Sequence, residues 1–296
     1  MTAHRIIEGD VRKALAGLET DSVHCVVTSP PYWNLRDYGA EGQIGAEASP
    51  RYYVETMVRV MAGVRRVLRP DGTLWLNIGD SSHRGQLAGV PWRLALAMQE
   101  DGWFLQREIV WHKPNPMPGN ATKGPSTSHE TVFLFSGKSP YYYDGYAVRE
   151  PGSSTDTRDL RSVWTIPVAR YKGSHFATFP EELARRCILA GSSERGCCLT
   201  CRKPYKRLLK RERTATGRAN RDPLRHVTAV SSLGFVPDCN CQRVVTTPIP
   251  CTILDPFAGA GTTNAVAAQL GRHSIGIEIH PQSAKLARER VAACQK

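Results

Sequence analysis

The chain lacks any long apolar run. Although 41% of its 296 residues are hydrophobic, no uninterrupted stretch approaches the roughly 18 residues that a membrane-spanning helix requires. The first ten residues, MTAHRIIEGD, also lack the apolar core of a secretory signal peptide. We therefore expect a cytoplasmic protein, in which cysteine thiols stay reduced.

Acidic residues are scarce relative to basic ones. The chain holds 27 Asp and Glu against 39 Lys and Arg, which gives a formal net charge of +12. An excess of this sign favours a polyanionic partner such as nucleic acid. The length of 296 residues suits one α/β domain with insertions.

A glycine-rich turn near the end of the chain matches neither GxGxxG nor GxxxxGKS/T, which disfavours a dinucleotide fingerprint and a P-loop. Residues 251–263, CTILDPFAGAGTT, predict a short strand, a tight turn at Gly259 and Gly261, and the start of a helix with free N–H groups. Glu278 follows near the end of the next expected strand, where an acidic side chain can bind ribose hydroxyls. The alternative is an ordinary strand–helix loop, and the placement of Glu278 favours a nucleoside cofactor.

A second turn follows the apolar run at residues 23–27, which predicts a buried strand. Residues 28–33, TSPPYW, contain two prolines that cannot donate to a strand ladder, so the chain forms a stiff elbow at the carboxyl end of the strand. Open α/β sheets bind ligands at that edge. The Ser29 hydroxyl, the Pro30 carbonyl and the Tyr32 ring suit the planar amino group of a base. A plain turn is the alternative for this stretch alone.

Together these motifs resemble those of a known family. DPFAGAGTT with Glu278 resembles the S-adenosylmethionine motif of amino-methyltransferases, and TSPPYW resembles their catalytic motif. The order, catalytic motif first, is similar to the β class of DNA amino-methyltransferases, and WNLRDYG, EIVWHKPNPMPG and SHETVFLFS extend the resemblance. Protein glutamine methyltransferases carry a similar Asn-Pro-Pro-Tyr downstream of their cofactor motif, so the order argues against them. The resemblance implies a circularly permuted Rossmann-like α/β fold, with a mostly parallel sheet and one antiparallel strand, 131–135, as its last.

The resemblance also implies roles for individual residues. Asp10 would lie beside the adenine, although it can equally cap the helix that follows. Phe179 and Pro180 would lie near the methionine end, with a plain capped helix as the alternative. The implied catalytic residues are Ser29, Pro30, Pro31 and Tyr32. The implied cofactor-binding residues are Asp10, Thr28, Phe179, Pro180, Asp255, Pro256, Phe257, Ala258, Gly259, Gly261, Thr262, Thr263 and Glu278.

The expected reaction is methyl transfer to an exocyclic amine of a base flipped out of double-stranded DNA. Ser at the first position of the elbow motif is typical of family members that act on cytosine N4, whereas Asp is commoner for adenine N6. We therefore predict N4 of cytosine and keep N6 of adenine as the alternative. No cysteine lies in the elbow, which disfavours methylation of cytosine C5 through a cysteine adduct.

Residues 137–174 mix basic and aromatic side chains, a composition that suits phosphates and bases. We expect a target-recognition segment here, and a polar loop over residues 34–50 beside the elbow. His129 and Glu130 are expected to be a solvated strand cap. The candidate DNA-binding residues are Arg36, Tyr38, Arg161, Trp164, Lys172, Lys206, Arg207 and Lys210.

Residues 192–249 form an insertion where related sequences need only a few residues. Cys198-x-x-Cys201 and Cys239-x-Cys241 supply four thiolates at spacings typical of structural zinc. Free thiols are the alternative, and Cys197 could replace Cys198. Residues 202–226 hold ten Lys and Arg, so +8 of the net charge of +12 lies between the cysteine pairs. Such a run is often a mobile, solvated loop, but we expect contact with the DNA backbone.

The expected organisation is a catalytic and cofactor-binding domain over residues 1–136, 175–191 and 250–296, a recognition segment over 137–174, and the cysteine-rich insertion over 192–249. A competing hypothesis is a zinc-containing DNA-binding protein that has lost catalysis. Bound S-adenosylmethionine in the purified protein would separate the two. The sequence leaves open the recognition site, a cognate restriction endonuclease, dimerisation, and a bacterial or phage host.

Overall fold

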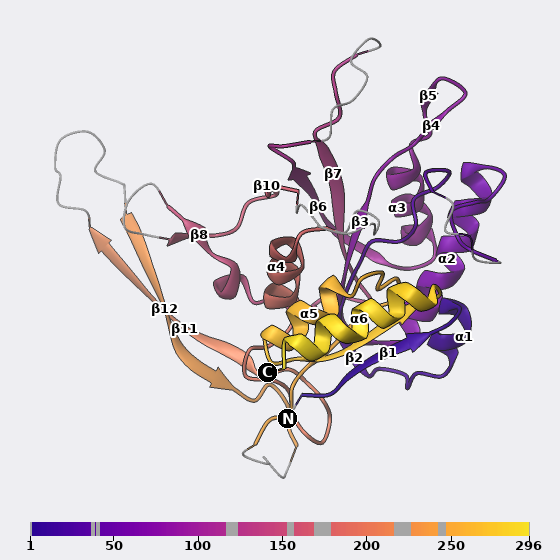
Figure 1. Ribbon diagram of the computed structural model, residues 1–296. Helices are drawn as coiled ribbons and strands as arrows, with labels where there is room; N and C mark the ends of the chain where they lie inside the picture. The colour runs from indigo at the N-terminus through magenta and orange to yellow at the C-terminus, as the bar shows by residue number, and fades with distance from the viewer. Residues whose placement is uncertain are drawn as a thin grey trace.

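The computed structural model describes residues 2–36, 39, 42–116, 124–152, 157–168, 179–215, 226–241 and 247–295. Its centre is a single eight-stranded sheet (Figure 1). The strands lie in the order β1 (His4–Glu8), β14 (His273–Glu278), β13 (Thr252–Asp255), β2 (Val23–Thr28), β3 (Leu68–Ile78), β7 (His129–Ser136), β6 (Phe104–His112) and β10 (Val163–Thr165). Only β7 runs antiparallel to its neighbours, β3 and β6. The predicted mostly parallel sheet with one antiparallel strand is confirmed.

Helices cover both faces of this sheet, and two apolar cores result. The helices α1 (Val11–Ala16), α2 (Pro50–Val67) and α3 (Val90–Glu100) pack one core, and α4 (Glu181–Gly191) and α5 (Thr262–Gln269) pack the other. The last helix, α6 (Pro281–Ala293), packs on α5 and β1. All six residues of β2 are buried, as expected for a parallel strand covered on both faces. Its apolar run is therefore continuous instead of alternating.

The circular permutation brings the two ends of the chain together. The late strand β13 lies between the early strand β2 and β14, and β14 pairs with β1. Both neighbours of β13 run parallel to it, with Leu254 opposite Val26 in β2. The carboxyl ends of these strands consequently meet at one edge of the sheet. The elbow after β2 and the glycine-rich turn after β13 therefore lie at the same edge.

The expectation that residues 131–135 form the last strand is wrong. Strand β10 adds to the sheet beyond β6, and Trp164 at its centre is 2% exposed. Thus part of the expected recognition segment belongs to the catalytic sheet and its core. With only three residues, β10 is too short to show the alternation by which strands are recognised.

The basic insertion is a hairpin instead of the loop that its charge suggests. Strands β11 (Lys206–Ala215) and β12 (His226–Val236) pair antiparallel along their length. Charged residues occupy consecutive positions in β11, so they lie on both its exposed face, at Lys206 and Lys210, and its half-buried face, where Arg207 pairs with Asp144. This is why no alternating pattern marks these strands.

The insertion is joined to the start of the catalytic strand by His24 of β2. His24 Nδ1 accepts a hydrogen bond from Thr252 N at 3.0 Å, so its Nε2 can donate to the Arg202 carbonyl at 2.8 Å. Arg69 Nη1 donates to the Cys201 carbonyl at 3.0 Å. The base of the insertion is therefore fixed to β2, β3 and β13 at their amino ends, opposite the elbow. Within the described ranges, no helix has the length and apolar character needed to cross a membrane.

Candidate active site

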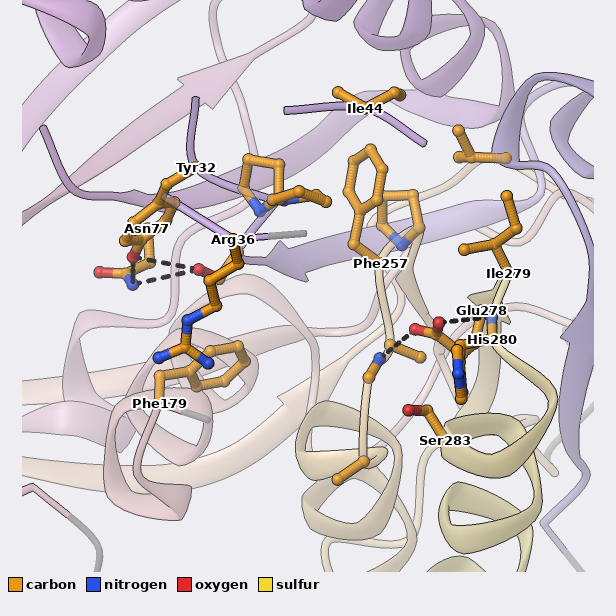
Figure 2. Close-up of a pocket in the computed structure, with 18 of the residues that line it drawn as sticks. Tyr32, Arg36, Ile44, Asn77, Phe179, Phe257, Glu278, Ile279, His280 and Ser283 are labelled. Atoms are coloured by element: carbon orange, nitrogen blue, oxygen red, sulfur yellow. Dashed lines mark hydrogen bonds between the residues drawn. The ribbon is translucent and has the colours of Figure 1, made fainter. Parts of the chain in front are cut away.

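A cavity of about 270 Å³ opens where the elbow and the glycine-rich turn meet. Residues 29–32 of the elbow line one end, and residues 256–260 of the turn line the other, together with Glu278. Figure 2 shows Tyr32 and Asn77 at one side and Phe257 and Glu278 at the other. Segments that are more than two hundred residues apart in the sequence thus share one site.

A chain of hydrogen bonds orients the elbow. Ser29 Oγ donates to Tyr32 Oη at 3.2 Å, and Tyr32 Oη donates to Glu130 Oε2 at 2.7 Å. Asn77 Nδ2 donates to Tyr32 Oη at 2.9 Å and to Glu130 Oε2 at 2.8 Å, while Lys113 forms an ion pair with Glu130. Because the chain ends on a carboxylate, both hydroxyl protons point toward Glu130. The Ser29 oxygen can therefore accept a hydrogen bond from a group in the cavity.

The Tyr32 ring is held rigidly. A Cβ atom added at Gly79 would lie 2.7 Å from Tyr32 Cε2, so the ring packs directly on the backbone after β3. Burial, and then the negative charge of Glu130, raise the pKa of Tyr32 well above its ordinary value. The phenol therefore stays neutral. From α2, Tyr53 Oη donates to the Pro31 carbonyl at 2.8 Å, which fixes the elbow from its other side.

Sequence reasoning missed Asn77, Lys113 and Glu130 as members of this site. The expectation of a solvated cap at Glu130 is wrong, because its side chain is 18% exposed and lines the cavity. Strand β7 is antiparallel, so its first residues, instead of its last, reach the ligand-binding edge. The predicted direction of β7 could have revealed Glu130, whereas nothing in the linear sequence marks Asn77.

The other end of the cavity has the groups that a nucleoside requires. Glu278 Oε2 accepts from Gly259 N and Oε1 from His280 N, each at 2.8 Å, and its remaining lone pairs can accept from ribose hydroxyls. A Cβ atom added at Gly259, where φ is +50°, would meet nothing within 4 Å, so the turn leaves open space. Phe257 and Ile279 supply apolar walls. These residues fit S-adenosylmethionine.

Asp10 caps the helix α1 and also lines the cavity, and its place beside the adenine stays a prediction. It caps α1 by accepting from Arg12 N at 2.8 Å. Its carboxylate also accepts from the Arg12 guanidinium, which is the main reason that the pKa of Asp10 lies below its ordinary value. Asp10 is therefore a carboxylate near neutral pH.

Several predicted cofactor contacts lie behind the cavity wall. Thr28 Oγ1 donates to Asp255 Oδ1 at 2.7 Å, and Thr263 Oγ1 donates to the Val27 carbonyl at 3.1 Å, so these buried residues hold β2 to the turn. Gly261 packs against Ala287, where an added Cβ would lie 2.8 Å from Ala287 Cβ. None of four predicted cofactor-binding residues lines the cavity; they pack behind its wall and support it: Thr28, Asp255, Gly261 and Thr263. Pro180 is buried at the start of α4. The other predicted residues line the cavity: Phe179, Pro256, Ala258 and Thr262.

Asp255 gives a testable pH dependence. Burial raises the pKa of Asp255 to about 6, so the folded state binds a proton more tightly than the unfolded state. Its contribution to stability is therefore fully present below about pH 4 and is lost as the pH rises through 6, a change of up to ~3 kcal/mol. We expect Asp255→Asn to flatten this part of the pH profile of the free energy of unfolding, measured in urea between pH 4 and 7.5. Equal pH slopes in both proteins would contradict the assignment.

The predicted DNA-binding residues differ in how exposed they are and in whether they line the cavity. Arg36 lines the cavity. The side chains of Arg161 and Lys210 are 65% and 55% exposed, and each also forms an ion pair, with Glu150 and Glu212 respectively. Lys206 is exposed as well. Tyr38 and Lys172 lie outside the described residues.

Two of those DNA-binding predictions are corrected. Trp164 is buried in the core, so it cannot stack on a DNA base. The Arg207 side chain is 10% exposed, pairs with Asp144 and Glu194, and lies 4.4 Å from the centroid of the Phe235 ring. Its charge is neutralised within the protein, which leaves no free charge for a phosphate.

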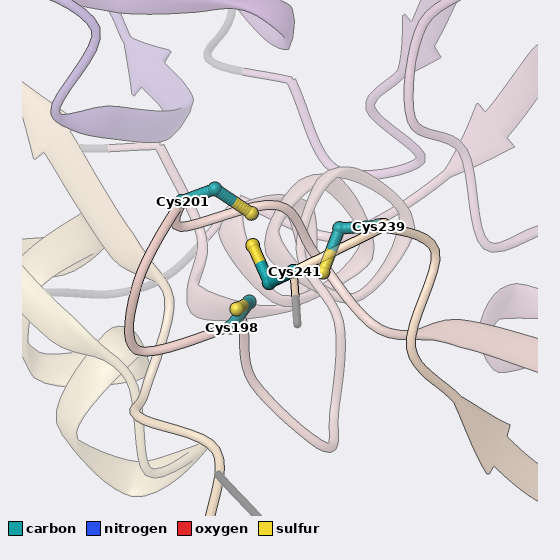
Figure 3. Close-up of side chains that lie close together, drawn as sticks. All are labelled: Cys198, Cys201, Cys239 and Cys241. Atoms are coloured by element: carbon teal, nitrogen blue, oxygen red, sulfur yellow. The ribbon is translucent and has the colours of Figure 1, made fainter. Parts of the chain in front are cut away.

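The four predicted cysteine ligands converge at the base of the hairpin (Figure 3). The Sγ atoms of Cys198, Cys201, Cys239 and Cys241 all lie within 4.8 Å of one another. Between them, Arg202 has a left-handed φ of +57°, and its N–H donates to the Cys198 carbonyl at 2.8 Å. This hydrogen bond closes a tight turn that holds the backbones of Cys198 and Cys201 close together.

The fold and the cavity define a Rossmann-like methyltransferase, and comparison with known proteins agrees. Residues 23–199 and 246–289 match the family profile described as DNA methylase (N6_N4_Mtase). The type II methyltransferase M.SmaI of Serratia marcescens is 38% identical, with 97% of this chain and 90% of that protein covered. The chain therefore belongs to the N6/N4 DNA methylase family. It is an S-adenosylmethionine-dependent DNA methyltransferase that acts on amino groups.

Solved structures share the fold. TTHA0409 of Thermus thermophilus, in complex with S-adenosyl-L-methionine, has a TM-score of 0.61 and 26% identity, and covers 99% of this chain and 96% of its own. The cytosine-N4-specific PvuII DNA methyltransferase has a TM-score of 0.67 and 17% identity, over 98% of this chain and 86% of that one. The second likeness concerns the fold alone.

Proposed function

We propose that the chain transfers a methyl group from S-adenosylmethionine to N4 of cytosine in double-stranded DNA. The observation that carries the choice of base is Ser29, a neutral hydroxyl at the head of the elbow, which is typical of the N4-cytosine members of the family. The hydrogen-bond chain supports it, because it directs the Ser29 proton toward Tyr32 and leaves the oxygen to accept from an amino group.

The cavity contains a second feature that favours cytosine. Lys113 lines it and retains N–H donors beyond the one that pairs with Glu130. Cytosine carries the carbonyl O2 beside N3, whereas adenine has a C–H group at the corresponding position. An ammonium donor on the wall therefore favours the pyrimidine.

In this mechanism the protein contributes orientation and electrostatics. Glu278, Phe257 and Ile279 would hold the cofactor, which supplies an electrophilic methyl group when bound. Ser29 Oγ and the Pro30 carbonyl accept the two N–H bonds of the amine, which favours localisation of the nitrogen lone pair. The Tyr32 ring holds the base flat, after the base has been flipped out of the duplex. The proton that N4 loses passes to Ser29 Oγ, while the Ser29 proton moves to Tyr32 and the Tyr32 proton to Glu130.

Mass spectrometry of nucleosides tests the choice of base. Unmethylated genomic DNA is incubated with the protein and deuterated S-adenosylmethionine, digested, and analysed for labelled bases. We expect labelled N4-methylcytosine. Label found only on N6-methyladenine would overturn the proposal in favour of the alternative.

We also infer that the cysteine cluster binds structural zinc. Four thiolates with mutual distances below 4.8 Å suit the tetrahedral geometry in which zinc lies about 2.3 Å from each sulfur. Zinc binding would deprotonate these thiols, since thiolates are the ligand form. Zinc here would fix the base of the hairpin beside His24 and Arg69.

The domain roles and the biological partner are proposals as well. We propose that residues 1–136, 175–191 and 250–296 carry catalysis, that the exposed part of 137–174 contributes to target recognition, and that Lys206 and Lys210 of the insertion attract the DNA backbone.

Since the relatives are named type II methyltransferases, we further propose that the chain protects host DNA against a restriction endonuclease. Methylation-sensitive sequencing of cells that express the protein would identify the protected site.

A further inference from the structure

A small hairpin projects from the ligand-binding edge beside the elbow. It consists of β4 (Ser82–His83) and β5 (Gln86–Leu87), and it follows β3 directly. Figure 1 shows it extending beyond α3, clear of the body of the protein. Strand β3 is the neighbour of β2 in the sheet, so the hairpin and the catalytic elbow leave adjacent strands at the same edge.

The hairpin is held rigidly at both feet. Asp80 Oδ1 accepts from Ser81 N at 2.9 Å and from Val90 N at 3.0 Å, and Asp80 Oδ2 accepts from Gly89 N at 2.9 Å. At the tip, Arg84 and Gly85 have φ angles of +51° and +80°. Two consecutive positive φ angles are those of a type I′ turn, which matches the twist of paired strands. The turn geometry therefore suits the pairing of β4 with β5.

A ring contact connects the hairpin to the catalytic elbow. The His83 ring packs edge-on against Trp33, with ring centroids 5.1 Å apart. Trp33 follows Tyr32 directly, is 2% exposed, and donates from Nε1 to the Glu47 carbonyl at 2.8 Å. The position of the hairpin is thus set by the elbow that orients the base.

The side chains of the hairpin suit contact with a DNA duplex: Arg84 is at the tip, and Leu87 is opposite Ser82 at the end nearer the sheet. Leu87 is 72% exposed, the highest value among the large apolar side chains in the described ranges, and Arg84 and Gln86 are also exposed. A single exposed leucine is ordinary on a protein surface. Here it lies on a hairpin at the same edge of the sheet as the elbow, and Leu35, also exposed, lines the cavity at that edge. Proteins that distort DNA insert apolar side chains between base steps, with cationic side chains on the backbone.

We propose that the β4–β5 hairpin lies against the duplex beside the target base, with Leu87 entering the space that the flipped base vacates and Arg84, at the tip, contacting a phosphate. This inference rests on the proposed function, because only an enzyme that extracts a base from double-stranded DNA needs such a wedge. Leu87 would stack on the neighbouring base pairs and prevent the target from returning, which makes the flipped state more populated.

The test compares paired and mispaired targets. The substrate is a duplex that carries the site identified by sequencing, and the measurement is total incorporation of radiolabelled methyl groups in single turnover. We expect Leu87→Ala to reduce the rate on the paired duplex by about tenfold or more, with unchanged affinity for S-adenosylmethionine. On a duplex with a mispaired target base, which is easier to extract, the deficit should largely disappear.

Control variants make the result specific. Leu87→Met keeps the apolar volume and should retain the wild-type rate, and Leu96→Ala removes a leucine that is 54% exposed on α3 and should change nothing. A wild-type rate for Leu87→Ala, or an equal deficit on both duplexes, would overturn the wedge. Because all methyl groups are counted, a product on adenine would refute the N4-cytosine proposal and leave this inference standing.

Discussion

Replacing Ser29 with alanine is expected to reduce the rate of methyl transfer by about 100- to 1,000-fold, the cost of removing one preorganised hydrogen-bonding group from the reacting centre. The loss should appear in the chemical step, because the variant removes the acceptor for the base amine. It leaves the cofactor end of the cavity intact. Single-turnover incorporation of labelled methyl groups, together with calorimetric titration of S-adenosylmethionine, measures the two effects separately.

Two further variants make that result specific to the proposed site. Glu278→Ala should weaken the binding of S-adenosylmethionine, which Ser29→Ala leaves unchanged, because it removes the proposed acceptor for the ribose hydroxyls. Thr20→Ala removes an exposed hydroxyl that accepts from Arg66 Nη1, just before the start of β2 at the edge of the sheet remote from the elbow, and should change neither quantity. If Ser29→Ala methylates DNA at the wild-type rate, the assignment of the elbow is refuted.

Loss of one cysteine ligand is expected to release the zinc. Replacing Cys201 with serine leaves three thiolates, and structural zinc sites derive about 10–16 kcal/mol from binding the metal. We expect the zinc content to fall from about one atom per chain to near zero. The insertion should then become sensitive to trypsin, since residues 202–226 contain ten Lys and Arg. Elemental analysis and limited proteolysis measure the two changes.

Cys294 provides a matched control for the zinc prediction. It is a free cysteine near the end of the chain, outside the cluster, so Cys294→Ser should keep both the metal and the resistance to trypsin. Cys197 is disfavoured as a zinc ligand in place of Cys198, because its thiol lies with His24 and Cys251 in a separate buried group. A zinc content near zero in freshly purified wild-type protein would refute the metal site.

Much of the fold could be predicted from local sequence. The strand at His4–Glu8, the helix over Pro50–Val67 and the strand at Phe104–His112 all have regular apolar spacing or continuous apolar runs, and turns bound them clearly. Several elements could not be predicted. The short strands, β10 among them, show no period, and β11 has charged residues at consecutive positions on its exposed and its half-buried face. Periodicity reports burial, so elements that bury little, or that are very short, remain invisible to it.

By itself, the sequence determined the chemistry available at each end of the chain: a proline-stiffened elbow with a hydroxyl and a ring, a glycine turn with an acidic partner, and two cysteine pairs. Only the tertiary structure decided which side chains meet. The antiparallel direction of β7 brings Glu130 to Tyr32, and the strand order places Thr28 and Asp255 behind the site as supports. The physical reason is that a motif fixes local geometry over a few residues, whereas strand order and direction are set by burial of the whole sheet.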